Sequence, residues 1–125
     1  NKERRNEYTK NRYKTDDLFK VKTSTRSLIT YSFRKRGYTK NSRTHEILGC
    51  SYEFFKQYLE DQFAPDMTWE NKSLWHLDHI IPLSTAKTYE EVIALNHYTN
   101  FQPLWGEDNQ SKSDRLDWIK PEEKY

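Results

Sequence analysis

The 125-residue chain contains a single cysteine, Cys50, and only three glycines and four prolines. One cysteine excludes an intramolecular disulfide and a zinc site built from several thiolates, and it suits a reducing cytoplasm. No apolar run approaches the roughly 18 residues that a membrane-spanning helix needs, and no signal-peptide core is visible. Because the chain begins at Asn1 rather than Met, we expect a fragment whose natural N-terminus lies upstream. These absences predict a cytoplasmic protein with no membrane partner and no structural zinc.

Apolar side chains are scarce as well. Hydrophobic residues make up 34% of the sequence and charged residues 32%, which predicts one domain with a small core. Aromatic residues reach 15% and compensate, because each ring buries a large apolar area. We expect the tryptophans to lie in the core rather than to stack on bases: Trp69, Trp75, Trp105 and Trp118.

The small net charge of +2 hides an uneven distribution. Residues 1–45 contain 14 basic and 4 acidic side chains, whereas residues 46–125 contain 7 basic and 15 acidic ones. A basic front segment beside an acidic remainder is typical of a segment that grips nucleic acid, and a solvated lysine-rich helix explains the charges equally well. From charge alone both interpretations stay open.

Capping residues predict a long helix near the front of the chain, preceded by a basic arm over residues 1–15. Asp16 or Asp17 begins this helix, which runs to about Arg36 and stops at Gly37. The periodicity assigns its core face to Leu18, Val21, Thr25, Leu28 and Ser32, widened by Phe19, Ile29 and Phe33. The other faces carry the basic residues: Lys20, Lys22, Arg26, Arg34, Lys35 and Arg36.

Two shorter helices and then two strands follow in the expected order. A turn over residues 44–48 ends at Gly49, and a helix from Ser51 reaches about Phe63. Residues 75–81 form a short strand, and Thr88 to Glu91 form a capping box whose helix buries Val92, Leu95 and Tyr98. Residues 101–105 form a second strand, which Pro103 limits to an edge, and residues 107 to about 113 form a last short helix.

The most informative residues lie at the joints of this strand, strand and helix unit. Asp78 and His79 are adjacent, Asn100 follows Asp78 by 22 residues, and Asn109 follows Asn100 by 9. Hydrolysis of a phosphodiester needs a base for a water molecule and positive charge near the phosphoryl and leaving oxygens. Neutral His79 can act as the base, and Asp78 can hold a divalent cation. Because neighbouring residues of a strand point to opposite faces, the two groups can bracket one phosphate.

These residues carry a resemblance to a known family. The run Trp-His-Leu-Asp-His-Ile-Ile-Pro, with Asn100 before a strand and Asn109 on a helix, resembles the HNH endonucleases of the phage and homing type, which have the ββα-metal fold. The resemblance implies that Asp78 is a metal ligand and His79 the general base. It implies further that Asn100 bridges the strands and steadies the base, and that Asn109 is the second metal ligand.

The chain departs from the family pattern at two points. Asn109 replaces the usual His, which gives an all-oxygen ligand set that favours one Mg²⁺ or Mn²⁺ ion, or else weakens metal binding. The paired cysteines of a structural zinc site, present in many relatives, are missing. The resemblance covers residues 75–115, about a third of the chain. It is weaker over residues 16–74.

Other residues near the motif have two interpretations each. His76 shares a strand face with Asp78 and can touch metal or phosphate, or simply pack or face solvent. Lys112 and Arg115 can hold phosphate, although a solvated helix face explains them as well. Asn100 and Asn109 also suit a turn and a helix start. We add the basic residues of the long helix as candidate DNA contacts: Arg26, Arg34, Lys35 and Arg36.

The sequence thus predicts an α+β fold: a basic helical segment (residues 1–45), a helical support (46–74) and a ββα-metal core (75–118). The expected activity is metal-dependent hydrolysis of double-stranded DNA to 5′-phosphate and 3′-hydroxyl ends. It would nick one strand, or cut both as a homodimer, in the bacterial host cytoplasm if a phage encodes the chain. Two alternatives stay open: an inactive DNA-binding module of the same fold, and a toxin-type nuclease with an immunity partner.

Overall fold

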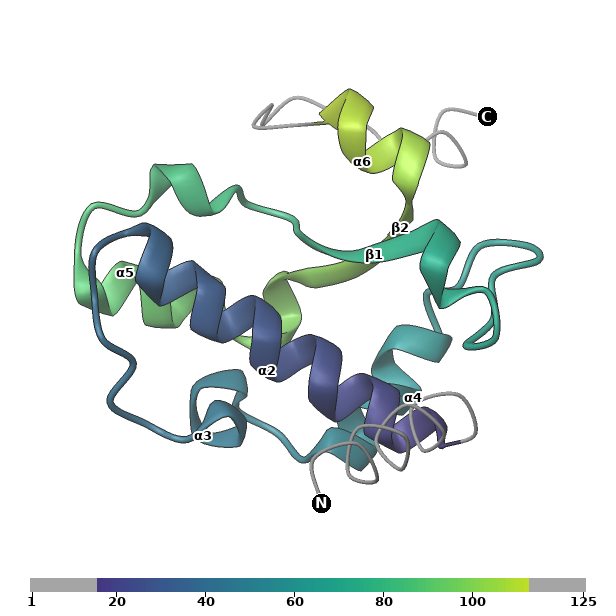
Figure 1. The fold of residues 1–125 in the computed structure, drawn as a ribbon, viewed down its shortest axis with the longest axis horizontal. Coiled ribbons are helices and arrows are strands. Elements are labelled where there is room, and N and C mark those ends of the chain that lie inside the picture. Colours follow the sequence, from purple (N-terminus) through teal and green to yellow (C-terminus); the bar gives the residue numbers. More distant parts are fainter. Residues whose placement is uncertain (1–15, 113–125) are drawn as a thin grey trace, which may run out of the picture.

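The computed structural model describes residues 16–112, which form a mostly helical small domain around a two-stranded antiparallel hairpin (Figure 1). The basic arm, Arg115 and Trp118 lie outside the described residues. The elements follow in this order: α2 (Asp17–Lys35), α3 (Thr44–Leu48), α4 (Tyr52–Glu60), η1 (Lys72–Leu74), β1 (Trp75–His79), η2 (Leu83–Thr85), α5 (Tyr89–Leu95), η3 (Tyr98–Asn100), β2 (Phe101–Trp105) and α6 (Gly106–Lys112). The expected α+β class is confirmed at this level.

Helix α2 begins and ends where its capping residues predict. The Asp16 carboxylate accepts a hydrogen bond from the backbone N–H of Phe19 at 3.1 Å, and Gly37 follows the helix at φ +82°. That left-handed backbone conformation is one that glycine adopts without steric cost. The core face includes Val21, Thr25, Ile29, Ser32 and Phe33, as expected. Leu18, Phe19 and Leu28, also assigned to that face, are only partly buried.

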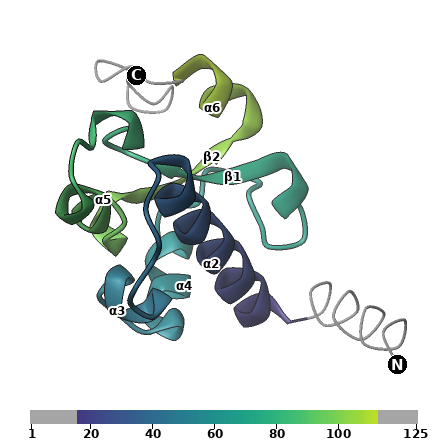
Figure 2. The ribbon, with the colours of Figure 1, turned by 60° about the vertical axis from the view of Figure 1, so that its left-hand side comes forward.

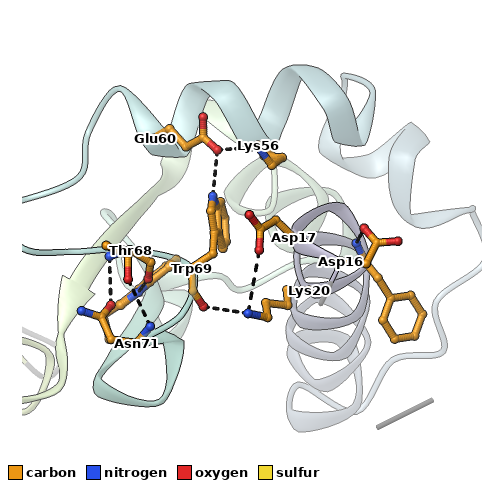
Figure 3. A network of polar contacts seen from close by, with 10 residues as sticks. Asp16, Asp17, Lys20, Lys56, Glu60, Thr68, Trp69 and Asn71 are labelled. Atoms are coloured by element: carbon orange, nitrogen blue, oxygen red, sulfur yellow. Dashed lines mark hydrogen bonds and ion pairs between the residues drawn. The ribbon is translucent and has the colours of Figure 1, made fainter. Parts of the chain in front are cut away.

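Lys20 corrects the prediction that every basic residue of α2 lies on an exposed face. Its side chain is buried, and its ammonium donates to the carbonyl of Trp69 at 3.0 Å and lies 3.8 Å from the Asp17 carboxylate (Figure 3). The loop before β1 crosses the first turn of α2 and covers this lysine. The Trp69 indole N–H in turn donates to Glu60 at 2.8 Å. Lys20 therefore ties the loop to the helix and does not face solvent.

Helix α4 is shorter than its sequence pattern predicts. Ser51 caps it by accepting from the N–H of Phe54 at 3.1 Å, but the helix ends at Glu60 rather than near Phe63. The backbone turns over the next residues, and Phe63 packs its ring on Trp69 and Trp75, with centroids 5.3 and 5.2 Å apart. The apolar periodicity continued past the helix because Phe63 is a core residue of the following turn.

The hairpin has a fixed register in which Asp78 lies opposite Gln102 and His79 lies opposite Phe101. Strand β1 ends at His79, two residues before the predicted end, and the next two residues, Ile80 and Ile81, are exposed. The second strand matches its prediction. Within the capping box, Thr88 accepts from the N–H of Glu91 at 3.1 Å, whereas the Glu91 carboxylate accepts from Lys87 instead of Thr88.

A single hydrophobic cluster joins these elements. It includes residues from α2, α3, α4, both strands and α5. Figures 1 and 2 show α6 on one side of the hairpin and α2 and α4 on the other, and α6 contacts both strands. Among residues 16–112 no helix is long and apolar enough to cross a membrane. The end of β1 therefore lies where α2 and α6 approach the same strand.

Candidate functional site

Asp78 is buried at the centre of the site, on the face of the hairpin that α6 covers. Its cross-strand neighbour Gln102 donates a side-chain hydrogen bond to the Oδ2 atom at 2.9 Å. The ammonium of Lys112, at the end of α6, lies 3.4 Å from the same oxygen. The side chains of Asp78 and Lys112 are only 9% and 4% exposed. One carboxylate oxygen therefore accepts a hydrogen bond from Gln102 and forms an ion pair with Lys112.

Lys112 also binds the backbone of the next residue in the strand. Its ammonium donates to the carbonyl oxygen of His79 at 2.9 Å. The sequence offered Lys112 as a surface phosphate contact, and the structure places it at the base of the site with two partners in β1. This charge is compensated by the ion pair with Asp78 and by the hydrogen bond to the carbonyl of His79.

His79 is held by an amide that the sequence analysis did not single out. Its Nε2 atom lies 2.8 Å from the Oδ1 atom of Asn96, and its ring packs on Phe101 with centroids 4.8 Å apart. Burial lowers the pKa of His79. The hydrogen bond to the Asn96 oxygen and the charge of Asp78 raise that pKa, and Lys112 lowers it, so the balance is downward. The ring is therefore predominantly neutral at neutral pH, the form that can accept a proton.

Asn96 reaches the site from the C-terminal cap of α5 and is completely buried. Its amide nitrogen donates to the carbonyl of Val92 at 2.9 Å, and the Ser32 hydroxyl of α2 lies 3.4 Å from its oxygen. Sequence reasoning passed over Asn96 because an asparagine after a helix is usually only a cap residue. Its contact with His79 depends on tertiary packing, and its position in sequence carries no signal of that contact.

Asn100 forms hydrogen bonds with both ends of the segment that connects the two strands. Its amide nitrogen donates to the carbonyls of Leu95 and Ile81, at 2.8 and 3.2 Å, and its side-chain oxygen accepts from the N–H of Ile81 at 2.9 Å. Its own carbonyl accepts from the N–H of Ile80. Asn100 therefore connects the turn after β1 to the end of α5, and within residues 16–112 it forms no hydrogen bond with His79.

A cleft of about 250 Å³ brings the predicted residues together. Its walls include Asp78 and His79 from β1, Asn109 and Lys112 from α6, Lys35 from α2 and Arg36 at the C-cap of that helix. The guanidinium of Arg36 also donates to the backbone carbonyl of Ala86. Basic residues at the end of α2 and the Asp78–His79 pair thus line one cleft, although more than 40 residues separate them in sequence.

The remaining candidates lie on the surface around this cleft. His76 is exposed and borders a neighbouring hollow with Tyr31, Lys72 and Asn109. Partial burial lowers the pKa of His76, and the nearby Lys72 lowers it further. The α2 residues Arg26, Arg34, Lys35 and Arg36 are all exposed.

The donor set at the cleft determines which metal ion it suits. Within the described part of the chain no group of three or more His, Cys, Asp or Glu side chains is arranged for a metal. Asp78 and Asn109 supply a carboxylate and a carboxamide oxygen in the same cleft. This set fits Mg²⁺ or Mn²⁺, which keep several waters and share phosphate oxygens, and it does not suit Zn²⁺.

The chain is similar to two proteins of Acanthamoeba polyphaga mimivirus. "Uncharacterized protein L426" is 38% identical over 129 residues, which cover 99% of this chain and 56% of that protein. "Uncharacterized protein L246" is 31% identical over 118 residues, covering 92% and 51%. The chain therefore spans about half the length of these curated relatives. No family model matches it, and no solved structure matches it significantly.

Proposed function

We propose that this chain is a metal-dependent endonuclease of the HNH type that hydrolyses phosphodiester bonds of double-stranded DNA. The observation that carries the proposal is the convergence of Asp78, His79 and Asn109 on one cleft with a basic helix as its wall. The order β1, β2, α6 and the contacts of α6 with both strands support this proposal. The names of the two viral relatives state no activity and add none to this argument.

His79 acts as the general base in this proposal. Its partly buried, predominantly neutral ring can take a proton from a water molecule that attacks the phosphorus. Phe101 and Asn96 restrict the ring on two sides, so the base keeps one orientation. The hydrogen bonds of Asn100 to Ile81 hold the turn that follows His79, and they support a bridging role for Asn100 in this proposal.

Asp78 and Asn109 would hold the Mg²⁺ or Mn²⁺ ion, which when bound supplies positive charge to the phosphoryl and leaving oxygens. Gln102 and Lys112 fix one oxygen of Asp78, and this restricts the carboxylate to one rotamer. The ammonium of Lys112 offsets the negative charge of Asp78 at the base of the cleft, so that this carboxylate repels a phosphate less.

The exposed face of α2 is the proposed DNA-binding surface. Arg26, Tyr31 and Arg34 border one shallow hollow of this face, and Lys35 and Arg36 continue it into the cleft. A protein that binds phosphates through Lys and Arg releases counterions, so its affinity falls steeply with salt. One cleft cuts one strand, and a double-strand break would need a homodimer or two successive nicks. We place this activity in the cytoplasm of the host.

The ion pair between Asp78 and Lys112 favours a second candidate function. An ammonium 3.4 Å from Oδ2 already neutralises the carboxylate and competes with a divalent cation for it. If Lys112 prevents a metal ion from binding Asp78, the chain is a DNA-binding module that has the ββα arrangement and does not cleave DNA. This alternative keeps the basic α2 face and removes the need for His79.

A plasmid-nicking assay with Mg²⁺, Mn²⁺ or EDTA distinguishes the nuclease from the DNA-binding module. We would compare the wild type with His79→Ala and with His45→Ala, a control that removes an exposed histidine of α3. The nuclease predicts metal-dependent nicking that His79→Ala abolishes and His45→Ala retains. Nicking that survives in His79→Ala contradicts the role of the base.

DNA binding should be measured in EDTA with increasing salt on the same proteins. If binding is salt-sensitive in all three proteins and none cleaves plasmid or viral DNA, the binding module is supported. Binding that does not change with salt contradicts both functions, because neither then depends on α2.

A further inference from the structure

We propose that Asn96 is a positioning residue that fixes the tautomer of His79, so that Nε2 carries the proton and Nδ1 is the nitrogen able to accept one. The hydrogen-bond assignment stands on the contacts alone. Its importance for cleavage rests on the proposed function of His79 as the base.

The orientation of the Asn96 amide follows from its second contact. The carbonyl of Val92 can only accept a hydrogen bond, so the group 2.9 Å from it is the Asn96 amide nitrogen. The Asn96 oxygen then faces His79 at 2.8 Å. Because an amide oxygen can only accept, the Nε2 atom of His79 must be the donor. A flipped amide would place two acceptors against each other at Val92.

Burial makes any other arrangement of these hydrogen bonds energetically unfavourable. Asn96 is completely buried, so water cannot replace either of its partners without a change in the core. The Ser32 hydroxyl lies 3.4 Å from the Asn96 oxygen but only 2.9 Å from the carbonyl of Leu28. A hydroxyl has one proton, and the shorter contact takes it. His79 is therefore the main donor to Asn96.

The same bond survives both protonation states of the base. When Nδ1 accepts a proton, Nε2 still carries its own and still donates to Asn96. A half-turn of the ring about its Cβ–Cγ bond would break this contact and leave the Asn96 oxygen with only the long contact to the Ser32 hydroxyl. Asn96 thus keeps one ring nitrogen in one place through the catalytic cycle, which a general base requires. The amide stands in the position where many catalytic histidines have a carboxylate.

Nuclear magnetic resonance of ¹⁵N-labelled protein tests the assignment without DNA or metal. Comparison with His79→Gln identifies the His79 ring signals. We expect a slowly exchanging proton on Nε2 and an unprotonated Nδ1 in the wild type at pH 8. A ring proton on Nδ1 would overturn the proposal. In Asn96→Leu, which removes the acceptor at similar volume, the Nε2 proton should exchange rapidly with water.

Kinetics then test the effect on cleavage. In Asn96→Leu we expect kcat to fall about 10- to 100-fold, part of the 10²- to 10⁴-fold that a general base supplies, with KM for DNA unchanged. Asn96→Asp keeps an acceptor oxygen and should retain more of kcat than Asn96→Leu. Thr25→Val is the matched control, because it also replaces a buried polar residue by an apolar one, outside the cleft.

The possible failures are distinguishable. A folded Asn96→Leu protein with wild-type kcat would overturn the positioning role. If Asn96→Leu does not fold, the wild-type spectrum and Asn96→Asp still decide the question. A wild type that carries the Nε2 proton but never cleaves DNA supports the hydrogen-bond assignment and contradicts the nuclease.

Discussion

The two ends of the hairpin are held by different physical interactions. At the Trp75 end, aromatic rings pack tightly: Trp75 is fully buried, and its centroid lies 5.2 Å from that of Phe63 and 5.3 Å from that of Trp69. At the His79 end, the neighbours are mostly polar, and buried amides and a lysine fix the side chains by hydrogen bonds. Apolar packing is non-directional, whereas hydrogen bonds require particular atoms at particular distances.

Along one short strand, the Trp75 end therefore contributes mainly to stability, and the His79 end carries the candidate site. The aromatic end should accept changes of side chain that keep the volume, because buried area and shape contribute most of the stability there. The polar end should accept very few, because each removed donor or acceptor leaves a buried partner unsatisfied. The predictions below test this contrast, from the largest expected effect to the smallest.

At the aromatic end, Trp75→Ala should lower the free energy of unfolding by about 3 to 5 kcal/mol, because it opens a cavity among buried rings. Trp75→Phe should cost clearly less, since most of the apolar area returns and only the hydrogen bond to the Thr68 carbonyl is lost. Urea denaturation followed by circular dichroism measures both. Equal losses would show that this end also depends on directional contacts.

At the polar end, Asn100→Leu should lower the free energy of unfolding by about 2 to 3 kcal/mol, because three side-chain hydrogen bonds disappear. Asn71 offers a matched control: its side chain also bonds backbone groups, but in a solvent-exposed loop (Figure 3). Asn71→Leu should cost about 1 kcal/mol or less, since water can replace its bonds. The same denaturation series applies, and a reversed order would contradict the contrast.

Lys112→Met should lower the free energy of unfolding by about 1.5 to 3 kcal/mol, because the buried Asp78 carboxylate loses its cation. Lys56→Met removes a more exposed ion pair with Glu60 inside α4 and should cost only about 0.3 to 0.5 kcal/mol. Thermal unfolding of both variants at low and high salt provides the comparison. A salt-sensitive effect at Lys112 would mean that water reaches this pair in solution.

Thr25→Val should raise the free energy of unfolding by about 1 kcal/mol. The Thr25 hydroxyl is buried, and among residues 16–112 it has no hydrogen-bond partner. Replacing it by a methyl group of similar size removes an unsatisfied polar atom from the core face of α2. A loss of stability in chemical denaturation would show that the hydroxyl finds a partner in solution.

Much of the secondary structure follows from local sequence signals. Asp16, Ser51 and Thr88 each accept a capping hydrogen bond at the start of the predicted helix, and Gly37 and Gly49 adopt the left-handed conformation that ends one. These signals work because a cap and its partner lie within four residues. Phe63 shows the limit, since a periodic apolar residue can belong to the turn after a helix.

The environment of the site could not be predicted in the same way. The motif locates Asp78 and His79, but their partners Lys112 and Asn96 lie 34 and 17 residues away in sequence and meet them only in the folded core. Lys20 was misassigned for a related reason, because a loop from residue 69 covers it. Side-chain type limits the chemistry of a residue, whereas packing selects its partner.

Pro103 has a further consequence for how copies of this chain meet. The hydrogen bond from the N–H of Ile80 to the carbonyl of Asn100 continues the register of the hairpin. In an antiparallel pair only every second residue pair is hydrogen-bonded, and by this count the pair of Leu77 and Pro103 is not. The nitrogen of Pro103 therefore faces the outer edge of β2. A proline nitrogen cannot donate, and Pro103 is itself fully buried. The middle of this edge therefore offers an incoming strand neither a donor nor access. Self-assembly by edge-to-edge sheet extension along β2 is blocked, and any homodimer must form through another surface.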